Sequence, residues 1–169
     1  MDLETISAHL EIQRALATYC RGVDRGDLEL IKSVYHEDGA EINHGGWRGN
    51  GREFAQRAVE RMDRTGRVGQ HHITNVLIHL DGAVAKVESY FLALHPSHNP
   101  TDGQIHLFPT GGRYLDRFER RAGVWKIATR EVIMDWSQPP LSNTAWAAAA
   151  AFLHGARRGD DPSYGFLAK

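Results

Sequence analysis

The chain has 169 residues, with 20 Lys and Arg against 21 Asp and Glu, which gives a formal net charge of −1. Hydrophobic residues make up 41% and charged residues 24%, as in ordinary soluble globular proteins. The balanced charge gives no electrostatic support for a nucleic-acid partner or for binding to a membrane surface. The single cysteine, Cys20, excludes a disulfide within the chain and a zinc site built on several thiolates.

The sequence also lacks the hydrophobic segments that direct proteins to membranes. The first residues, MDLETISAHLEIQR, are acidic and polar where a signal peptide needs a basic start and an apolar core. No apolar run approaches the roughly 20 residues that span a bilayer. We therefore expect a cytoplasmic protein with one domain over residues 1–169, comprising a core over about 5–137 and a C-terminal helix and tail over 138–169.

The N-terminal part of the chain predicts three helices. Apolar residues recur there at three- and four-residue steps, and Asp27 and Asn50 can cap the second and third helices. Gly22 and Gly26 are expected to weaken the first helix near its end. The expected helices run over residues 6–23, from 28 to near 39, and from the Asn50 cap to about 62.

After residue 70 the pattern changes to that of β-strands. The first strand is β-branched and apolar, and Asp81-Gly82 and Ala122-Gly123 are expected to form turns. The expected strands span residues 72–80, 84–94, 112–121 and 124–136, with a loop at 95–109 and a final helix at 144–154. Helices followed by an antiparallel meander and a closing helix predict an α+β fold, with one sheet covering a helical layer.

The histidines are numerous but form no recognisable metal motif. The chain has 10 of them, and the adjacent His71 and His72 resemble a ligand pair at first sight. Adjacent side chains on a strand point to opposite faces, so these two can hardly bind one ion. There is no His-Glu-x-x-His, no phosphate loop and no Gly-x-Ser-x-Gly motif. We expect neither a metal nor a cofactor.

Several short motifs, in their order and spacing, resemble those of one protein family. They are Gly22-Val23-Asp24-Arg25-Gly26-Asp27, Gln70-His71-His72-Ile73-Thr74-Asn75, Gly111-Gly112-Arg113-Tyr114 and Gly123-Val124-Trp125-Lys126-Ile127. Over about residues 5–137 the chain resembles the SnoaL-like, scytalone dehydratase-like branch of the nuclear-transport-factor-2-like superfamily. The resemblance implies a cone-shaped α+β fold, in which a curved antiparallel sheet wraps around the N-terminal helices and a deep apolar cavity.

The resemblance also implies a pair of catalytic residues. The lineage contains scytalone dehydratase, bile-acid 7α-dehydratase and hexachlorocyclohexane dehydrochlorinase, in which an Asp–His pair removes a C–H proton without a cofactor. By position, Asp24 matches the aspartate and His72 matches the histidine. The chemistry agrees, because a neutral imidazole can take a proton near neutral pH. A carboxylate on its other nitrogen fixes the tautomer and stabilises the imidazolium that forms.

Four further residues are implied as substrate-binding residues of the cavity. They are Tyr19, His95, Tyr114 and Arg130. The first matches the tyrosine of the bile-acid enzyme, and Arg130 departs from the apolar pocket of scytalone dehydratase, which implies a different substrate. Alternatives remain open, because Arg130 could equally pair with Glu131 or Asp135, and Tyr114 and His95 could be plain cavity wall.

The implied function is a cofactor-independent lyase acting on a hydrophobic, aromatic or steroid-like small molecule. It would eliminate water or another small group, or lose a small fragment by retro-aldol cleavage. An isomerase or polyketide-type cyclase would use the same proton abstraction. A non-catalytic assembly protein, such as a dioxygenase small subunit, would need neither Asp24 nor His72. The family also implies a homo-oligomer, either a dimer or a trimer.

Overall fold

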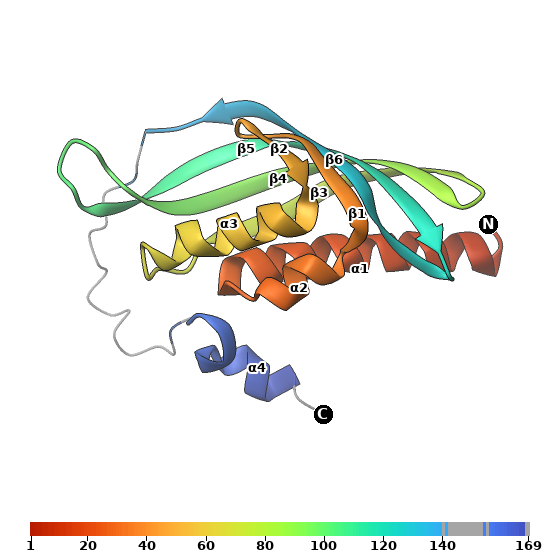
Figure 1. The fold of residues 1–169 in the computed structure, drawn as a ribbon, viewed down its shortest axis with the longest axis horizontal. Coiled ribbons are helices and arrows are strands. Elements are labelled where there is room, and N and C mark those ends of the chain that lie inside the picture. The colour runs from red at the N-terminus through yellow and green to blue at the C-terminus, as the bar shows by residue number, and fades with distance from the viewer. Residues whose placement is uncertain (140, 142–153, 155, 168–169) are drawn as a thin grey trace.

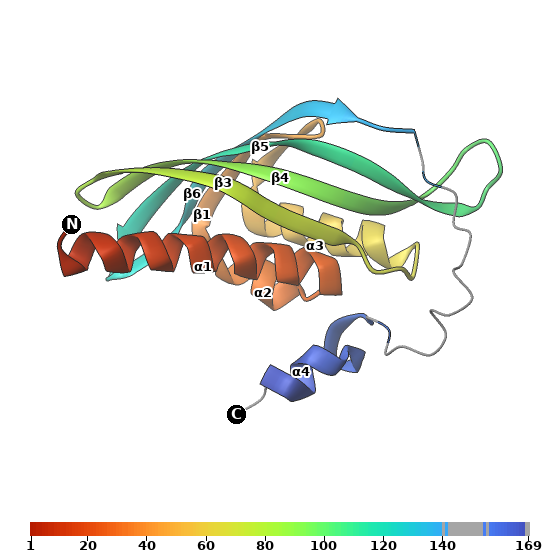
Figure 2. The same ribbon diagram turned by 180° about the vertical axis from the view of Figure 1, so that it is seen from behind.

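A computed structural model describes residues 1–139, 141, 154 and 156–167. One curved sheet of six strands lies over a layer of helices, as Figures 1 and 2 show from opposite sides. The predicted α+β class is therefore confirmed. The helices are α1 (Leu3–Arg25), α2 (Leu28–Ser33), α3 (Gly51–Asp63) and α4 (Pro162–Leu167). The strands are β1 (Tyr35–His44), β2 (Trp47–Asn50), β3 (Gln70–Asp81), β4 (Val84–His98), β5 (Ile105–Arg121) and β6 (Val124–Ser137). The helix predicted at 144–154 lies outside the described residues, apart from His154.

Helix α1 does not weaken at Gly22, contrary to the prediction from sequence. It continues to Arg25 and ends at Gly26, whose left-handed backbone (φ 65°) suits a glycine C-cap. Gly22 instead allows α2 to pack closely, since a Cβ there would lie 2.8 Å from Cγ1 of Ile31. Because the helix stays intact, Asp24 lies in its last turn with its side chain toward the sheet.

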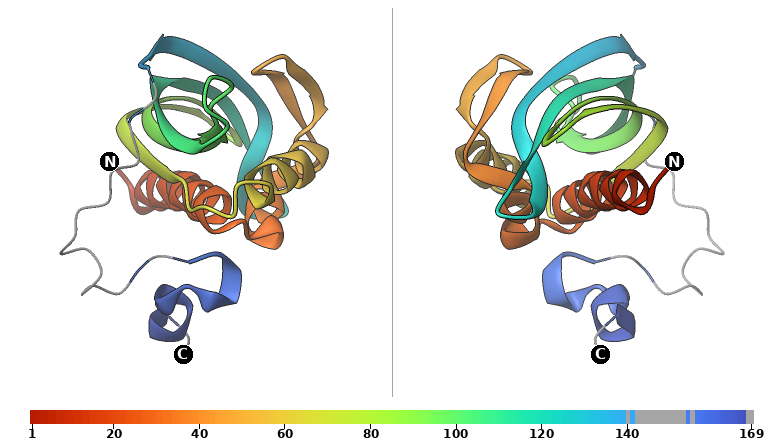
Figure 3. Two further views of the ribbon diagram at one scale, coloured as in Figure 1. Left: turned by 90° about the vertical axis from the view of Figure 1, so that its left-hand side faces the viewer. Right: turned by 90° about the vertical axis from the view of Figure 1, so that its right-hand side faces the viewer.

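Residues 35–50 form two strands that the sequence did not reveal. Helix α2 ends at Ser33 rather than near Gly39, and β1 then pairs with β6 in parallel and with β2 antiparallel. The sheet is therefore mixed rather than purely antiparallel, and its order is β2-β1-β6-β5-β4-β3. It curls over the helices without closing into a barrel, and Figure 3 shows this curvature along the length of the molecule.

The predicted meander of the last four strands is confirmed, with longer strands than expected. Strands β4 and β5 extend into the loop predicted at 95–109 and pair out to His98 and Ile105. Along β4 the residues from Ala85 to Ala93 alternate between buried and more exposed positions, so one face of the strand meets the helices. His95 continues this inward-facing series.

The core lies between α1 and the concave face of the sheet. Apolar side chains from α1, α2, α3 and five of the strands form one cluster. Its fully buried members include Ile12, Ile31, Tyr35, Phe118 and Ile127. Among the described residues, no helix is long and apolar enough to cross a membrane.

The C-terminal segment, residues 156–164, contacts the ends of α1 and α3. The Asp161 carboxylate lies 3.0 Å from Nε of Arg25 and accepts a hydrogen bond from the backbone N–H of Ala156 at 2.9 Å. Arg157 donates through Nη2 to Asp63 on α3 at 2.6 Å. Figures 1 and 2 show α4 on the side of the helical layer away from the sheet. Ionic contacts therefore connect this segment to the helices.

Acid is expected to release the C-terminal segment. Hydrogen bonds from Ser163 and from the backbone of Ala156 hold the pKa of Asp161 well below its usual 3.8. Burial opposes a similar shift at Asp63, but hydrogen bonds from Arg158 and Arg157 lower its pKa as well. A lowered pKa means that docking is favoured above about pH 4 and is lost as the pH falls further. Hydrogen exchange of residues 156–164 at pH 7 and pH 3, corrected for intrinsic rates, tests this, and equal protection at both pH values would contradict it.

Candidate functional site

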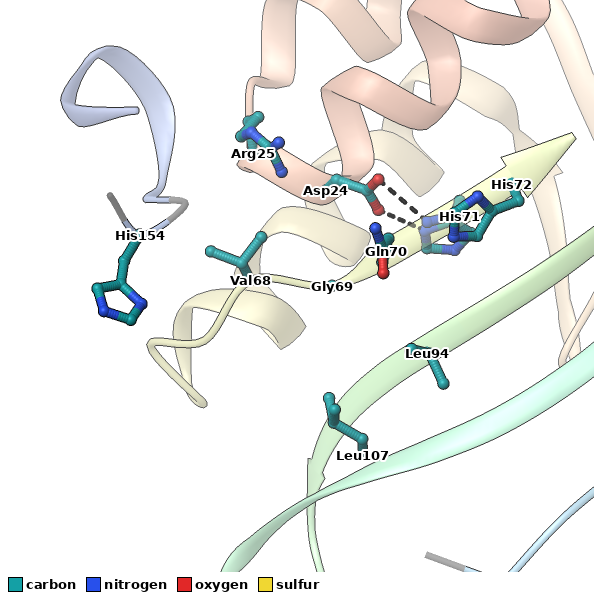
Figure 4. Close-up of a pocket in the computed structure, with 10 residues that line it drawn as sticks. All are labelled: Asp24, Arg25, Val68, Gly69, Gln70, His71, His72, Leu94, Leu107 and His154. Atoms are coloured by element: carbon teal, nitrogen blue, oxygen red, sulfur yellow. Dashed lines mark hydrogen bonds and ion pairs between the residues drawn. The ribbon is translucent and has the colours of Figure 1, made fainter. Parts of the chain in front are cut away.

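The site is built around a hydrogen-bonded pair formed by Asp24 and His71. Asp24 lies on the last turn of α1 and His71 at the start of β3, as Figure 4 shows. Oδ1 of Asp24 lies 2.6 Å from Nδ1 of His71, and Oδ2 accepts the backbone N–H of His71 at 3.0 Å. Both side chains are largely buried. The carboxylate therefore fixes the ring and its backbone together.

This arrangement determines which ring nitrogen of His71 can act on a ligand. A carboxylate accepts hydrogen bonds, so Nδ1 carries the hydrogen that faces Asp24, and Nε2 is left as a proton acceptor. The carboxylate also stabilises the positive charge that appears when Nε2 takes a proton. The pair has the features of a general base held in one orientation.

The sequence predicted His72 as the partner of Asp24, but in the structure Asp24 pairs with the preceding residue, His71. His72 lies on the exposed face of β3, although it lines a surface pocket of about 420 Å³ that also touches Asp24 and His71. His71 faces inward because it belongs to the part of β3 before a β-bulge at Asn75, whose φ is 48° and where the pairing with β4 shifts register. Beyond the bulge, even-numbered residues such as Val76 and Ile78 face the core, whereas before it odd-numbered ones do. The bulge reverses the inward face of the strand.

His71 lines a cavity of about 530 Å³ between α3 and the concave face of the sheet. This is within the range of volumes typical of small-molecule sites. The lining is mostly aromatic and apolar, with a few polar side chains. Its apolar members include Phe54, Met62, Phe91, Phe108, Val132 and Met134, and its polar members include His44, Arg61, His71, His95, Ser97 and Tyr114.

His95 lies beside His71 in this cavity. The two rings meet edge to face with their centroids 4.9 Å apart. Nδ1 of His95 is buried and has no hydrogen-bond partner among the described residues. Burial, with contributions from His71, Arg61 and His44, lowers the pKa of His95 from 6.5 to about 3. The ring is therefore neutral near pH 7 and offers an unpartnered polar atom to a ligand.

The lowered pKa of His95 predicts how stability depends on pH. The unfolded chain binds a proton at this residue below pH 6.5 and the folded protein does so only near pH 3. Its contribution to the free energy of unfolding is therefore complete above pH 6.5 and is lost progressively as the pH falls toward 3. His95→Gln should make the unfolding temperature fall less steeply below pH 6.5 than in the wild type. Parallel curves for the two proteins, measured by circular dichroism, would contradict this.

The other three predicted binding residues occupy different positions. Tyr114 lines the cavity and stacks on Phe91 with ring centroids 4.7 Å apart. Tyr19 and Arg130 are fully buried beneath Tyr114 and are not part of the cavity lining in the described structure. The Arg130 guanidinium lies 4.3 Å from the centre of the Tyr19 ring and 4.1 Å from that of Tyr114. These two residues therefore support the cavity wall from behind.

Arg130 pairs with an acid that the sequence did not indicate. Its Nε and Nη2 both donate at 2.7 Å to the two carboxylate oxygens of Asp116, which is directly opposite it in the β5–β6 register. Of the two acids considered from sequence, Asp135 instead pairs with Arg113 at the surface. Burial raises the pKa of Asp116 and opposes the effect of the arginine.

Comparison with known proteins assigns the chain to a family. The SnoaL-like domain matches residues 4–131. The chain belongs to the SnoaL-like family. A comparison with curated proteins finds no match. Among solved structures, this SnoaL-like protein is similar to a variant of Rv3472, a protein of unknown function from Mycobacterium tuberculosis, with 30% identity over 76% of each chain and a TM-score of 0.61.

Two other solved structures resemble this SnoaL-like protein at lower identity. One is the hexachlorocyclohexane dehydrochlorinase LinA-type3 from Novosphingobium barchaimii, with 20% identity over 87% of this chain and 99% of that chain and a TM-score of 0.72. The other is a putative scytalone dehydratase from Novosphingobium aromaticivorans, with 22% identity, 79% and 88% coverage and a TM-score of 0.68. These likenesses establish the fold.

The cavity of this SnoaL-like protein also includes residues that the sequence analysis missed. His44 and Phe54 line it from β1 and α3, and Glu41 lies behind His44. Residues 41 and 44 share one side only because of a register shift in β1, and no sequence signal marks that irregularity. Phe54 and Arg61 lie on α3, which was predicted. The strands β1 and β2 beside it were not predicted, so the sequence could not show that these two side chains face a cavity.

The remaining candidates for reactivity are metal-binding clusters and the thiol of Cys20. No three His, Cys, Asp or Glu side chains within these ranges gather in a way that could bind a metal ion. Cys20 is buried on α1, as its place on the apolar stripe predicts, and burial raises the pKa of its thiol to about 12. The thiol is therefore protonated near neutral pH and is a poor nucleophile.

Proposed function

We propose that this protein is a cofactor-independent lyase that eliminates water, or another small leaving group, from a hydrophobic carbonyl compound. The observation that supports it most directly is the Asp24–His71 pair on the wall of an apolar cavity, next to the unpartnered Nδ1 of His95. The similarity to a dehydrochlorinase and to a putative scytalone dehydratase agrees with elimination chemistry.

The proposed reaction begins with removal of a proton from the carbon next to the carbonyl group. Nε2 of His71 takes this proton, and Asp24 stabilises the resulting imidazolium through Nδ1. The electron pair of the broken C–H bond forms the enolate. It then makes a carbon–carbon double bond as the leaving group on the next carbon departs. Such a positioned base accelerates proton transfer by about 10²–10⁴-fold.

The cavity indicates the class of substrate. Aromatic walls from Phe54, Phe91 and Phe108 suit a flat ring system, and the cavity volume of about 530 Å³ admits two or three fused rings. Burial raises the pKa of Tyr114, so its hydroxyl stays protonated and can donate to a carbonyl oxygen. His95 offers a second polar contact. We therefore propose an aromatic or steroid-like ketone with a leaving group β to the carbonyl.

Two reactions of one scaffold compound test this function. In D₂O, the wild-type protein should exchange the C–H protons next to the carbonyl of α-tetralone, which has no leaving group. It should also convert the β-hydroxy derivative of α-tetralone into α-naphthol and water, with a loss of water in the product mass. Protein that catalyses neither reaction above the buffer rate contradicts the proposal.

The same measurements separate the lyase from the other functions considered. An isomerase or cyclase would use the same base, but its product would have the mass of the substrate. A non-catalytic assembly protein would give no exchange at all. The buried Asp24–His71 pair favours an enzyme, because a scaffold has no need of a polar pair facing an apolar cavity.

A further inference from the structure

A second carboxylate–histidine pair lies in the same cavity, on strand β1. Nδ1 of His44 lies 3.1 Å from Oε2 of Glu41. The other carboxylate oxygen of Glu41 accepts the hydroxyl of Tyr35 at 2.5 Å, and both Glu41 and Tyr35 are fully buried. The carboxylate is thus fixed by two hydrogen bonds, as Asp24 is fixed by its two contacts with His71. This pair was not expected from the sequence and is not used by the mechanism proposed above.

The His44 ring faces the cavity rather than the core. It stacks on Phe54 with centroids 4.0 Å apart and an interplanar angle of 26°, which fixes its orientation. Both His44 and His71 line the cavity, although β6, β5 and β4 lie between β1 and β3 in the sheet. With Nδ1 directed at Glu41, Nε2 is the nitrogen that can reach a ligand. The sheet is curved, as Figure 3 shows, and both histidines line the same cavity on its concave side.

His44 is one of the two hydrogen-bond partners of the buried Glu41 carboxylate within the described ranges. A buried carboxylate needs a cationic partner or several donors. Arg130 is a buried cation, but its Nε and Nη2 bind Asp116, and its Nη1 has no hydrogen-bond partner in the part of the chain that the structure describes. Among the described residues, the hydrogen-bonded neighbours of Glu41 are then Tyr35, which stays neutral because burial raises its pKa, and His44, which can become cationic. Glu41 thus stabilises a charged His44 in the same way that Asp24 stabilises a charged His71.

We infer that His44 is the general acid of the reaction and donates a proton to the leaving oxygen of a β-hydroxy carbonyl substrate. This inference rests on the proposed function. As His71 takes the C–H proton, the electron pair forms the double bond, and the C–O bond breaks with its pair on oxygen. That oxygen takes the proton from Nε2 of His44 and leaves as water, which leaves His44 neutral and His71 protonated. Proton exchange with solvent restores both rings.

A general acid at His44 also specifies the kind of leaving group. Hydroxide is a poor leaving group and needs protonation, whereas a carboxylate such as acetate leaves without it. Proton abstraction at carbon by His71 does not require His44. Reactions that need only removal of the C–H proton should therefore depend on His71 alone, whereas elimination of water should depend on both histidines.

Replacement of His44 by glutamine tests the inference with three forms of one compound. The side chain of His44 is only partly buried, so the variant is expected to fold. His44→Gln should lower water elimination from the β-hydroxy derivative of α-tetralone by about 100-fold or more. It should leave deuterium exchange of α-tetralone and loss of acetate from the β-acetoxy derivative within about threefold of the wild type. Glu41→Gln should give the same pattern with a smaller loss.

A histidine outside the cavity provides the matched control. His106 is also bonded to a carboxylate, Asp102, at 2.7 Å, but it does not line the cavity of His44. His106→Gln should change none of the three reactions. The inference is overturned if His44→Gln eliminates water at the wild-type rate, or if it loses exchange and acetate elimination as severely as water elimination. The proposed function, as distinct from the role of His44, fails if His71→Gln exchanges α-tetralone at the same rate as the wild type.

Discussion

His71→Gln is expected to reduce both deuterium exchange of α-tetralone and elimination from its β-substituted forms by about 10³-fold. Both reactions begin with the same proton transfer, so a loss confined to one of them would be inconsistent with a base at this position. Glutamine retains a polar side chain of similar reach but cannot take a proton near neutral pH. The effect should appear in kcat, with the KM for α-tetralone changed much less, because the base acts in the transition state.

The neighbouring histidine is the natural control for this variant. His72 is one residue away on the same strand but on its exposed face, so His72→Gln should react within about twofold of the wild type. Asp24→Asn should resemble His71→Gln, because an amide can present a donor to Nδ1 and so favour the wrong tautomer. If His72→Gln were the inactive variant and His71→Gln were active, the assignment of the base would be reversed. Circular dichroism of all three variants shows whether the fold is retained.

Much of the fold could be predicted because local signals agreed with the final structure. The capping side chains of Asp27 and Asn50 accept the backbone N–H groups expected at the starts of α2 and α3. The Ala122-Gly123 turn has positive φ at both residues, as a tight hairpin requires. Strand β1 pairs with β6 in parallel, and no local pattern indicates this pairing because it joins residues far apart in the chain. Its pairing with β2 is local, across Gly45 and Gly46 with positive φ, and this hairpin signal was missed.

The candidate site was predictable in its chemistry but not in its geometry. The resemblance to the family gave Asp24 and, by position, His72, whereas the structure pairs Asp24 with the preceding residue, His71. The inward face of β3 also changes at Asn75, which has positive φ, so no single alternation describes the whole strand. Similarly, a register shift in β1 brought Glu41 and His44 together. Bulges near a site change which side chains enter it, and they are poorly encoded in local sequence.

The largest effect on stability is expected at the buried pair of Asp116 and Arg130. Strands β5 and β6 also hold a second pair of the same type, which serves as a control. Arg113 binds Asp135 through Nε and Nη2 at 3.0 Å, whereas Arg130 binds Asp116 through the same atoms at 2.7 Å. Both side chains of the first pair are part-exposed, at 31% and 38%, and both of the second are at 0%. The two-point geometry of the pairs is therefore matched. They differ in burial, and Arg113 also has Glu88 at 3.7 Å from its Nη1.

Asp116→Asn is expected to lower the free energy of unfolding by about 3–5 kcal/mol, because it leaves the Arg130 guanidinium buried without a counter-charge. The rings of Tyr19 and Tyr114 on either side of that guanidinium cannot replace a carboxylate. Asp135→Asn should shift the urea midpoint only slightly, since water and salt already screen the exposed pair. The double variant Asp116→Leu/Arg130→Met should recover much of the loss, because it removes the unpaired charge and fills similar volume. Tryptophan fluorescence during urea unfolding measures these midpoints. Equal midpoint shifts for Asp116→Asn and Asp135→Asn would contradict the prediction that burial makes the first pair more important for stability.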